Sequence, residues 1–187
     1  MAIKTFGAGA VLTASDTNTY LANSGLVYVT SVTFSAQSSV SINNCFNSTY
    51  TNYRIMLNLN GSSAGAYASF RLRASGSDRS STDYFMAGYY SSWNGGLNAY
   101  NAGGQTSMSS VGSWGGNIAS GCSIDIFSPA VSTDRTNWSV RVVDAGAGVV
   151  YSRDTVFAVT EAQDGFTVYP SAGTMTGTIT VYGYRKA

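Results

Sequence analysis

Residues 164–187 read Asp164-Gly-Phe-Thr-Val-Tyr-Pro-Ser-Ala-Gly-Thr-Met-Thr-Gly-Thr-Ile-Thr-Val-Tyr-Gly-Tyr-Arg-Lys-Ala187 and contain two strand patterns joined by a turn. The first pattern, residues 165–169, ends at Pro170, because proline cannot donate a ladder hydrogen bond. In the second, residues 178–184, threonine and tyrosine alternate with isoleucine and valine, all of which favour strands. This stretch therefore predicts a β-hairpin and not a helix.

Period-two patterns of the same kind recur along the chain from Leu26 onward, and no helical periodicity separates them. The clearest cover residues 26–34, 53–59, 66–74, 122–127, 138–143 and 155–160, with weaker ones at 38–42 and 83–90. Together they predict roughly ten strands in one domain. We therefore predict an all-β fold, an antiparallel β-sandwich of the jelly-roll type, over residues 26–187.

Residues 1–25 differ from the rest and predict an N-terminal arm with a short helix. Thr13-Ala-Ser-Asp16 resembles a capping box, and Asn23-Ser-Gly25 supplies a stop, so the helix interior would run over residues 14–22. Such a short helix is marginal alone in water and must dock on something. Either it caps the open end of the sandwich, or it anchors the domain to a larger assembly or a trimer axis.

The composition excludes several partners. The net charge is +1 and only 10% of the 187 residues are charged, without any basic cluster, which argues against nucleic-acid binding. No apolar run approaches the roughly 18 residues that cross a bilayer, and the first residues lack a signal-peptide core. We therefore expect no membrane insertion and assembly in a cytoplasm, where Cys45 and Cys122 would be reduced thiols.

The sequence lacks most of the residue types that catalytic sites use. It contains no histidine, which removes the usual general base, the serine and cysteine triads, and the commonest metal ligand. Asp154, Glu161 and Asp164 are close in sequence and could supply the two carboxylates of a glycosidase, although Asp164 before glycine is typical of a turn. We predict a protein that is not an enzyme and that uses no cofactor and no metal.

The segment between Asp83 and Asp125 carries no charged residue, and residues 88–121 are dominated by glycine, serine and asparagine. Weak periodicity predicts long loops or irregular strands there. Aromatic residues among small polar ones are typical of adaptable binding loops. The candidate glycan-contact residues, which could equally form a subunit interface, are Tyr89, Tyr90, Trp93, Tyr100 and Trp114.

Four segments carry a resemblance to a known family. The segment Phe6-Gly-Ala-Gly-Ala-Val-Leu-Thr-Ala-Ser-Asp-Thr-Asn-Thr-Tyr-Leu-Ala-Asn-Ser-Gly-Leu-Val-Tyr-Val29 resembles the leader of many tailed-bacteriophage virion structural proteins. Residues 164–185 are similar to the last hairpin of phage fibre and virion-decoration sandwiches. Tyr50-Thr-Asn-Tyr-Arg-Ile-Met-Leu-Asn-Leu59 and Phe70-Arg-Leu-Arg-Ala-Ser-Gly76 fit the same pattern.

This resemblance implies a multimeric, most simply trimeric, β-sandwich carried on a virion as a short fibre, decoration or cement protein. Its partners would be further copies of itself and other capsid, neck or tail proteins. Residues 1–25 would attach to the particle through their apolar side chains, Phe6, Val11, Leu12, Tyr20 and Leu21. The leading hypothesis is thus a non-enzymatic phage virion component, and the alternative is an adhesin module that binds host surface glycans.

Overall fold

A computed structural model describes residues 7–11, 13–16, 25–63, 65–114 and 118–185. This part of the chain forms one short helix and thirteen strands: α1 Ala14–Asp16, β1 Leu26–Gln37, β2 Val40–Ile42, β3 Asn52–Gly61, β4 Tyr67–Ala74, β5 Ser77–Asp78, β6 Tyr84–Ser92, β7 Leu97–Gln105, β8 Met108–Ser113, β9 Ser120–Phe127, β10 Arg135–Asp144, β11 Val149–Thr160, β12 Gly165–Pro170 and β13 Met175–Tyr184.

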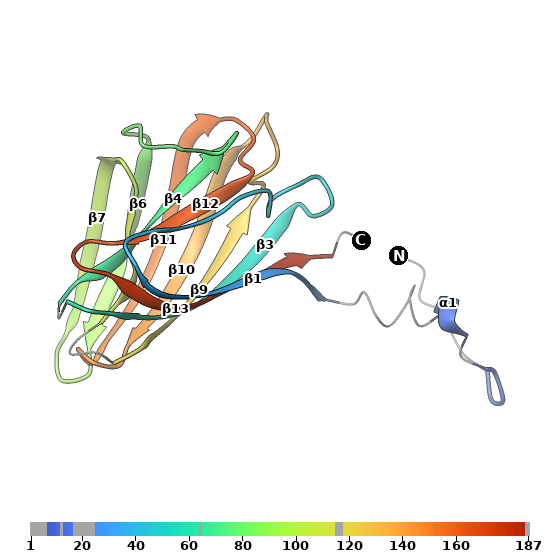
Figure 1. The fold of residues 1–187 in the computed structure, drawn as a ribbon, viewed down its shortest axis with the longest axis horizontal. Helices are drawn as coiled ribbons and strands as arrows, with labels where there is room; N and C mark the ends of the chain where they lie inside the picture. Colours follow the sequence, from blue (N-terminus) through green and yellow to red (C-terminus); the bar gives the residue numbers. More distant parts are fainter. Residues whose placement is uncertain (1–6, 12, 17–24, 64, 115–117, 186–187) are drawn as a thin grey trace.

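The strands form two antiparallel sheets that pack face to face (Figure 1). The larger sheet has eight strands in the order β1-β13-β3-β9-β10-β11-β6-β7, and the smaller has the order β2-β12-β4-β5, with β8 also paired to β4. This arrangement confirms the predicted all-β, antiparallel, jelly-roll-like sandwich. The predicted hairpin of residues 164–187 is divided between the sheets, because β12 pairs with β2 and β4 whereas β13 pairs with β1 and β3.

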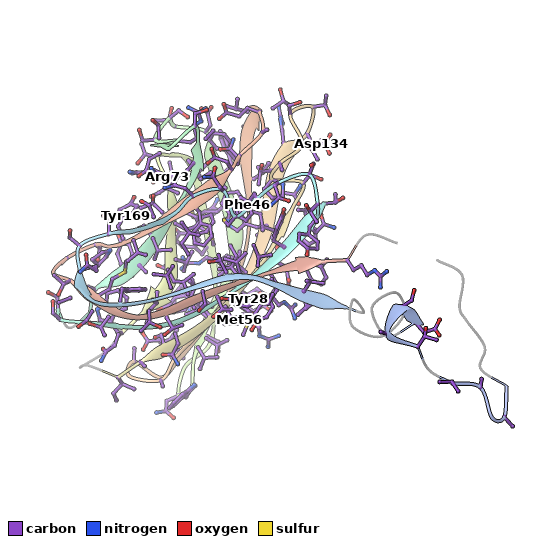
Figure 2. All side chains as sticks on the ribbon, turned by 45° about the vertical axis from the view of Figure 1, so that its right-hand side comes forward. Tyr28, Phe46, Met56, Arg73, Asp134 and Tyr169 are labelled. Atoms are coloured by element: carbon purple, nitrogen blue, oxygen red, sulfur yellow. The ribbon has the colours of Figure 1, made fainter. Side chains whose placement is uncertain are left out.

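The core lies between the sheets and follows from strict alternation in the long strands. In β10, for example, every second residue is buried and its neighbours are exposed. Phe70 occupies the centre of the core, with its ring centroid 5.0 Å from that of Phe166 and 5.6 Å from that of Trp138. Figure 2 shows Phe46 in this core, between Arg73 on the outer side of the smaller sheet and Met56 on the outer side of the larger one.

The predicted capping box is present at the start of α1. The Thr13 Oγ1 hydroxyl donates to Asp16 Oδ2 at 2.7 Å, and the Asp16 backbone N–H donates to Thr13 Oγ1 at 3.1 Å. Figure 1 shows α1 clear of both sheets, so it does not cap the open end of the sandwich there. Val11 is exposed, whereas the predicted continuation of the helix and the other four proposed anchoring residues, Phe6, Leu12, Tyr20 and Leu21, lie outside the described residues.

Long loops or irregular strands were predicted for residues 88–121, and the described residues of this segment, 88–114 and 118–121, form mostly strands. β6 and β7 form a hairpin at one edge of the larger sheet, and β8 extends the smaller sheet. β7 was not predicted as a strand because it is an edge strand rich in glycine, alanine and asparagine. Neither of its faces shows the run of large apolar residues by which a strand is recognised in a sequence. A neighbouring strand, and not the intrinsic preference of the residues, holds it extended.

Both cysteines are free thiols inside the sandwich. Burial raises the pKa of the Cys45 thiol to about 12 and raises the pKa of Cys122 still further above its usual range. A raised pKa lowers the thiolate fraction at neutral pH, and the thiolate is the reactive form. The two residues therefore serve as small core side chains.

Candidate functional site

The outer face of the eight-stranded sheet carries the candidate site, because no element of the described chain packs against it. Alternation turns every second side chain of each strand to this face, and the register aligns these side chains from strand to strand. One aligned row crosses all eight strands, from β7 to β1, and consists of Asn101, Ala87, Asp154, Ser139, Asp125, Arg54, Tyr182 and Tyr28.

The first hollow on this face, named groove A, lies over β7, β6, β11 and β10 and has a volume of about 610 Å³. Its lining residues are Phe85, Met86, Ala87, Asn101, Ala102, Gly103, Asn137, Trp138, Ser139, Asp154, Thr155 and Val156. The Phe85 ring is 45% exposed although it lies within the sheet. It rests on Gly103, where an added Cβ would come within 3.0 Å of the ring.

Polar side chains surround the exposed ring in groove A. Asn137 and Asn101 provide amide groups, which can both donate and accept hydrogen bonds. Asp154 lies directly across from Ser139 on the neighbouring strand, and the Ser139 hydroxyl donates to its Oδ1 at 2.5 Å. Asp154 is the one charged side chain that lines groove A. The groove thus combines an apolar ring with donors and acceptors that point outward.

The second hollow, named groove B, lies over β10, β9, β3 and β13 and has a volume of about 420 Å³. Its lining residues are Met56, Leu57, Asn58, Gly121, Cys122, Ser123, Arg141, Val143, Thr178 and Thr180. Arg141 is the one charged side chain of this lining. Gly121 forms an open part of the floor, because an added Cβ there would meet nothing within 4 Å.

A closed polar cluster lies on the same face outside both grooves. Arg54 binds Asp125 with two hydrogen bonds, of 2.8 and 2.5 Å, and the Tyr184 hydroxyl donates to the same carboxylate at 2.5 Å. Burial acts to raise the pKa of Asp125, but the hydrogen bonds from Arg54 and Tyr184 outweigh it and lower that pKa. The carboxylate of Asp125 is therefore already occupied by its own neighbours.

The aromatic residues singled out in the sequence do not form one surface. Tyr89 is 49% exposed on the outer face of the larger sheet, opposite Ser152, and Trp93 is 65% exposed in the β6–β7 turn. Tyr90 and Tyr100 turn to the other face of the sheet, where the Arg153 guanidinium carbon lies 3.9 Å from the Tyr100 ring centroid.

Trp114 is a core residue, which corrects its assignment as a glycan-contact or interface residue. Its indole is fully buried, and Nε1 donates to the Ser63 carbonyl at 3.0 Å. The ring fills the space beside Gly61, where an added Cβ would lie 1.9 Å from it. The glycine-rich, uncharged sequence around Trp114 predicted an exposed residue, but Trp114 packs inside the sandwich.

The three carboxylates considered for a glycosidase do not converge. Asp154 lies in groove A, Glu161 pairs with Arg79 at 2.7 Å, and Asp164 accepts the Ser75 backbone N–H at 2.7 Å. Among the residues that the structure describes, no three His, Cys, Asp or Glu side chains are placed to hold a metal ion. No helix in that part of the chain is long and apolar enough to span a membrane.

Of the groove-lining residues, sequence reasoning singled out Asp154 alone, and for a different role. Phe85 was detectable, because it alternates with the inward-facing Tyr84 and Met86 in residues 84–90. Asn137 and Arg141 carried no local signal, since their positions relative to Phe85 and Asp154 depend on which strands are neighbours. The register of β10 with β11 brings them onto one surface.

Comparisons with known proteins bear on the fold alone. No protein-family model matches the chain, and no curated protein sequence matches it. Among solved structures, the chain is similar to a galectin of Caenorhabditis elegans, with 13% identity over 81% of this chain and 94% of that one and a TM-score of 0.37. It is also similar to an alginate lyase, with 13% identity over 83% and 80% of the two chains and a TM-score of 0.29. At these values the likeness carries no argument about function.

Proposed function

We propose that this protein is a non-enzymatic carbohydrate-binding module that receives an oligosaccharide on the outer face of its eight-stranded sheet. The observation that carries the proposal is the lining of groove A, where the exposed Phe85 ring lies among the amides of Asn101 and Asn137 and the carboxylate of Asp154. A sugar ring has an apolar C–H face and a rim of hydroxyl groups. The apolar face would stack on the phenyl ring, while the amides and the carboxylate would bind the hydroxyls.

The size and rigidity of groove A support this assignment. Its volume of about 610 Å³ is within the range of small-molecule sites, roughly 300–1,000 Å³. Its side chains stand on four neighbouring strands, so their spacing is fixed by the backbone ladder before a ligand arrives. Preorganisation of this kind reduces the entropy that binding would otherwise cost.

The same lining supports binding without catalysis. Glycoside hydrolysis by the common mechanism needs two carboxyl groups on either side of the scissile bond. Groove A offers Asp154 alone, and Asp125, the acid next along the aligned row, is engaged by Arg54 and Tyr184. We therefore expect polysaccharides to keep their size on incubation with the protein.

Removal of the Phe85 ring tests the proposal. We expect Phe85→Ala to weaken binding to an oligosaccharide, selected on a glycan array, by about 30-fold or more in calorimetric titration, because hot-spot rings contribute about 2 kcal/mol or more. Phe127→Ala is the matched control: Phe127 is also an exposed phenylalanine of the same face, opposite Asn137, but it does not line either groove.

Phe127→Ala should leave the affinity within twofold. Ala87→Trp, which adds a ring in the middle of groove A, should abolish binding with an unchanged thermal midpoint. Equal effects of Phe85→Ala and Phe127→Ala, or an array on which no glycan is bound, would contradict the proposal.

We also propose that residues 1–25 attach the sandwich to a larger particle, in keeping with the resemblance to virion structural proteins of tailed bacteriophages. Two observations favour this second function. Figure 1 shows α1, which begins at the Thr13–Asp16 capping box, clear of the sandwich, and Val11 just before it is exposed. Burial of the Val11 side chain against another protein would remove its apolar surface from water.

Assembly can be measured on the full chain by light scattering. We expect a homotrimer, and we expect Val11→Asp to shift it towards the monomer, because a carboxylate would be buried in the contact. Val159→Asp is the control, since Val159 is an exposed valine on β11, far from the arm in sequence. This second proposal would be overturned if the protein stays monomeric at every concentration and is not found on the particle when virions are imaged.

A further inference from the structure

We propose that the ligand is an acidic oligosaccharide that crosses β10, with hydroxyl-rich units in groove A and a carboxylate or sulfate group in groove B, bound by Arg141. This inference rests on the proposed carbohydrate-binding function and adds the chemical class and the direction of the ligand.

The two grooves adjoin at one strand, β10, which contributes side chains to both. The outward side chains of β10 follow one another at every second residue: Asn137 and Ser139 line groove A, and Arg141 and Val143 line groove B. The grooves together cover seven adjacent strands, from β7 to β13. At the usual strand spacing this is roughly 30 Å. A monosaccharide fills part of one groove, whereas a sugar chain is needed to occupy both.

Arg141 is an exposed guanidinium that forms no ion pair or hydrogen bond with any residue of the described chain. Its cross-strand neighbours are Ser152 on β11 and Ser123 on β9, whose side chains are short and uncharged. Other arginines already form ion pairs within the protein: Arg54 pairs with Asp125, and Arg79 pairs with Glu161. The guanidinium of Arg141 is therefore available to a ligand.

The remaining lining of groove B favours an anion. The Ser123 hydroxyl, directly opposite Arg141 on β9, can donate a hydrogen bond beside the guanidinium. The Asn58 amide lies farther along the groove on β3, and no carboxylate lines the groove. A guanidinium matches the planar geometry of a carboxylate or sulfate and binds it through two parallel hydrogen bonds. Charge complementarity thus selects an acidic substituent over a neutral one.

The opposite charge in groove A gives the ligand a direction. Asp154 would repel an acidic group that lay over Phe85, but it accepts hydrogen bonds from hydroxyls. An acidic chain would therefore place its neutral, hydroxylated part in groove A and its acidic part in groove B. The two grooves together would select a ligand by its charge as well as by its length.

The decisive experiment compares matched acidic and neutral oligosaccharides on the full chain by calorimetric titration. The probes are oligogalacturonates and their carboxyl-reduced forms, and sulfated galactan oligomers and their desulfated forms, each from two to eight units. We expect the acidic member of at least one pair to bind at least 10-fold more tightly, with an affinity that rises with length and falls with added salt.

Substitutions then assign the preference to groove B. Arg141→Gln should lower the affinity for the acidic oligosaccharide to that of its neutral partner, and Arg141→Lys should keep part of the preference. Arg135→Gln is the matched control, because Arg135 is an exposed arginine of the same strand that lines neither groove. Gly121→Phe, at a position where an added Cβ meets nothing within 4 Å, should fill groove B and remove the gain of affinity with length.

The outcomes separate this inference from the proposed function. Binding of neutral and acidic partners with equal affinity, unchanged by Arg141→Gln, would overturn the acidic ligand and leave the carbohydrate-binding function standing. Failure of every oligosaccharide to bind would overturn both. Binding of poly-glutamate as tightly as of the acidic oligosaccharide would show that Arg141 serves an acidic protein partner, which also overturns the inference.

Discussion

Trp114→Ala lowers the free energy of unfolding by about 3–5 kcal/mol, the largest effect that we expect of a single substitution in this protein. The indole is fully buried beside Gly61, and its Nε1 donates to the Ser63 carbonyl. Truncation removes the transfer free energy of the ring, leaves a cavity and deprives that carbonyl of its donor. Denaturation in urea, followed by circular dichroism, measures the loss.

Trp93→Ala provides the comparison, because Trp93 is 65% exposed in a neighbouring part of the same sequence segment. Surface substitutions of this kind change stability by about 0.5 kcal/mol or less. If Trp114→Ala is too unstable to purify, Trp114→Phe keeps most of the volume and should cost an intermediate amount. Equal stability of the two alanine variants would show that Trp114 is not a core residue.

Gly165→Ala is expected to lower the free energy of unfolding by about 1–3 kcal/mol, because overpacking forces the backbone to move. A Cβ at Gly165 would lie 2.1 Å from the Ile42 carbonyl oxygen and 3.0 Å from the Asn43 Cα. These atoms belong to the backbone at the end of β2 and cannot turn away as a side chain could. The β2–β12 junction, which also includes the hydrogen bond from Phe46 N–H to the Asp164 carbonyl, would have to open.

Gly121→Ala is the matched control for the second prediction. Both glycines lie in strands with ordinary negative φ, but a Cβ at Gly121 meets nothing within 4 Å. We expect its thermal midpoint to equal or slightly exceed that of the original protein, since alanine restricts the unfolded chain. A fall of similar size in both variants would mean that the contact with β2 does not set the cost at Gly165.

Several elements could be predicted because their signal is local. Residues 53–59, 66–74 and 122–127 alternate between large apolar and polar side chains, and they form β3, β4 and β9. The capping box at Thr13 was equally local, since its two partners are three residues apart. In each case, neighbours in sequence supply the structural constraint.

β7 and Trp114 could not be predicted in this way. β7 has few strand-forming residues and is extended because β6 pairs with it along its length. Trp114 follows a glycine- and serine-rich stretch that is typical of an exposed loop, yet its ring fills a space that Gly61 leaves open. Both outcomes depend on partners that are distant in sequence.

By itself the sequence determined the all-β class, the two-sheet sandwich and the capped start of the arm, because alternation and capping are encoded within a few consecutive residues. Only the tertiary structure decided that Phe85, Asn137 and Asp154 share groove A and that Arg141, farther along β10, lines groove B. Their meeting depends on strand order and register, and a shift of one residue would turn every outward side chain of a strand into the core. Register is fixed when all the strands pack together, so no single stretch of the chain contains the site.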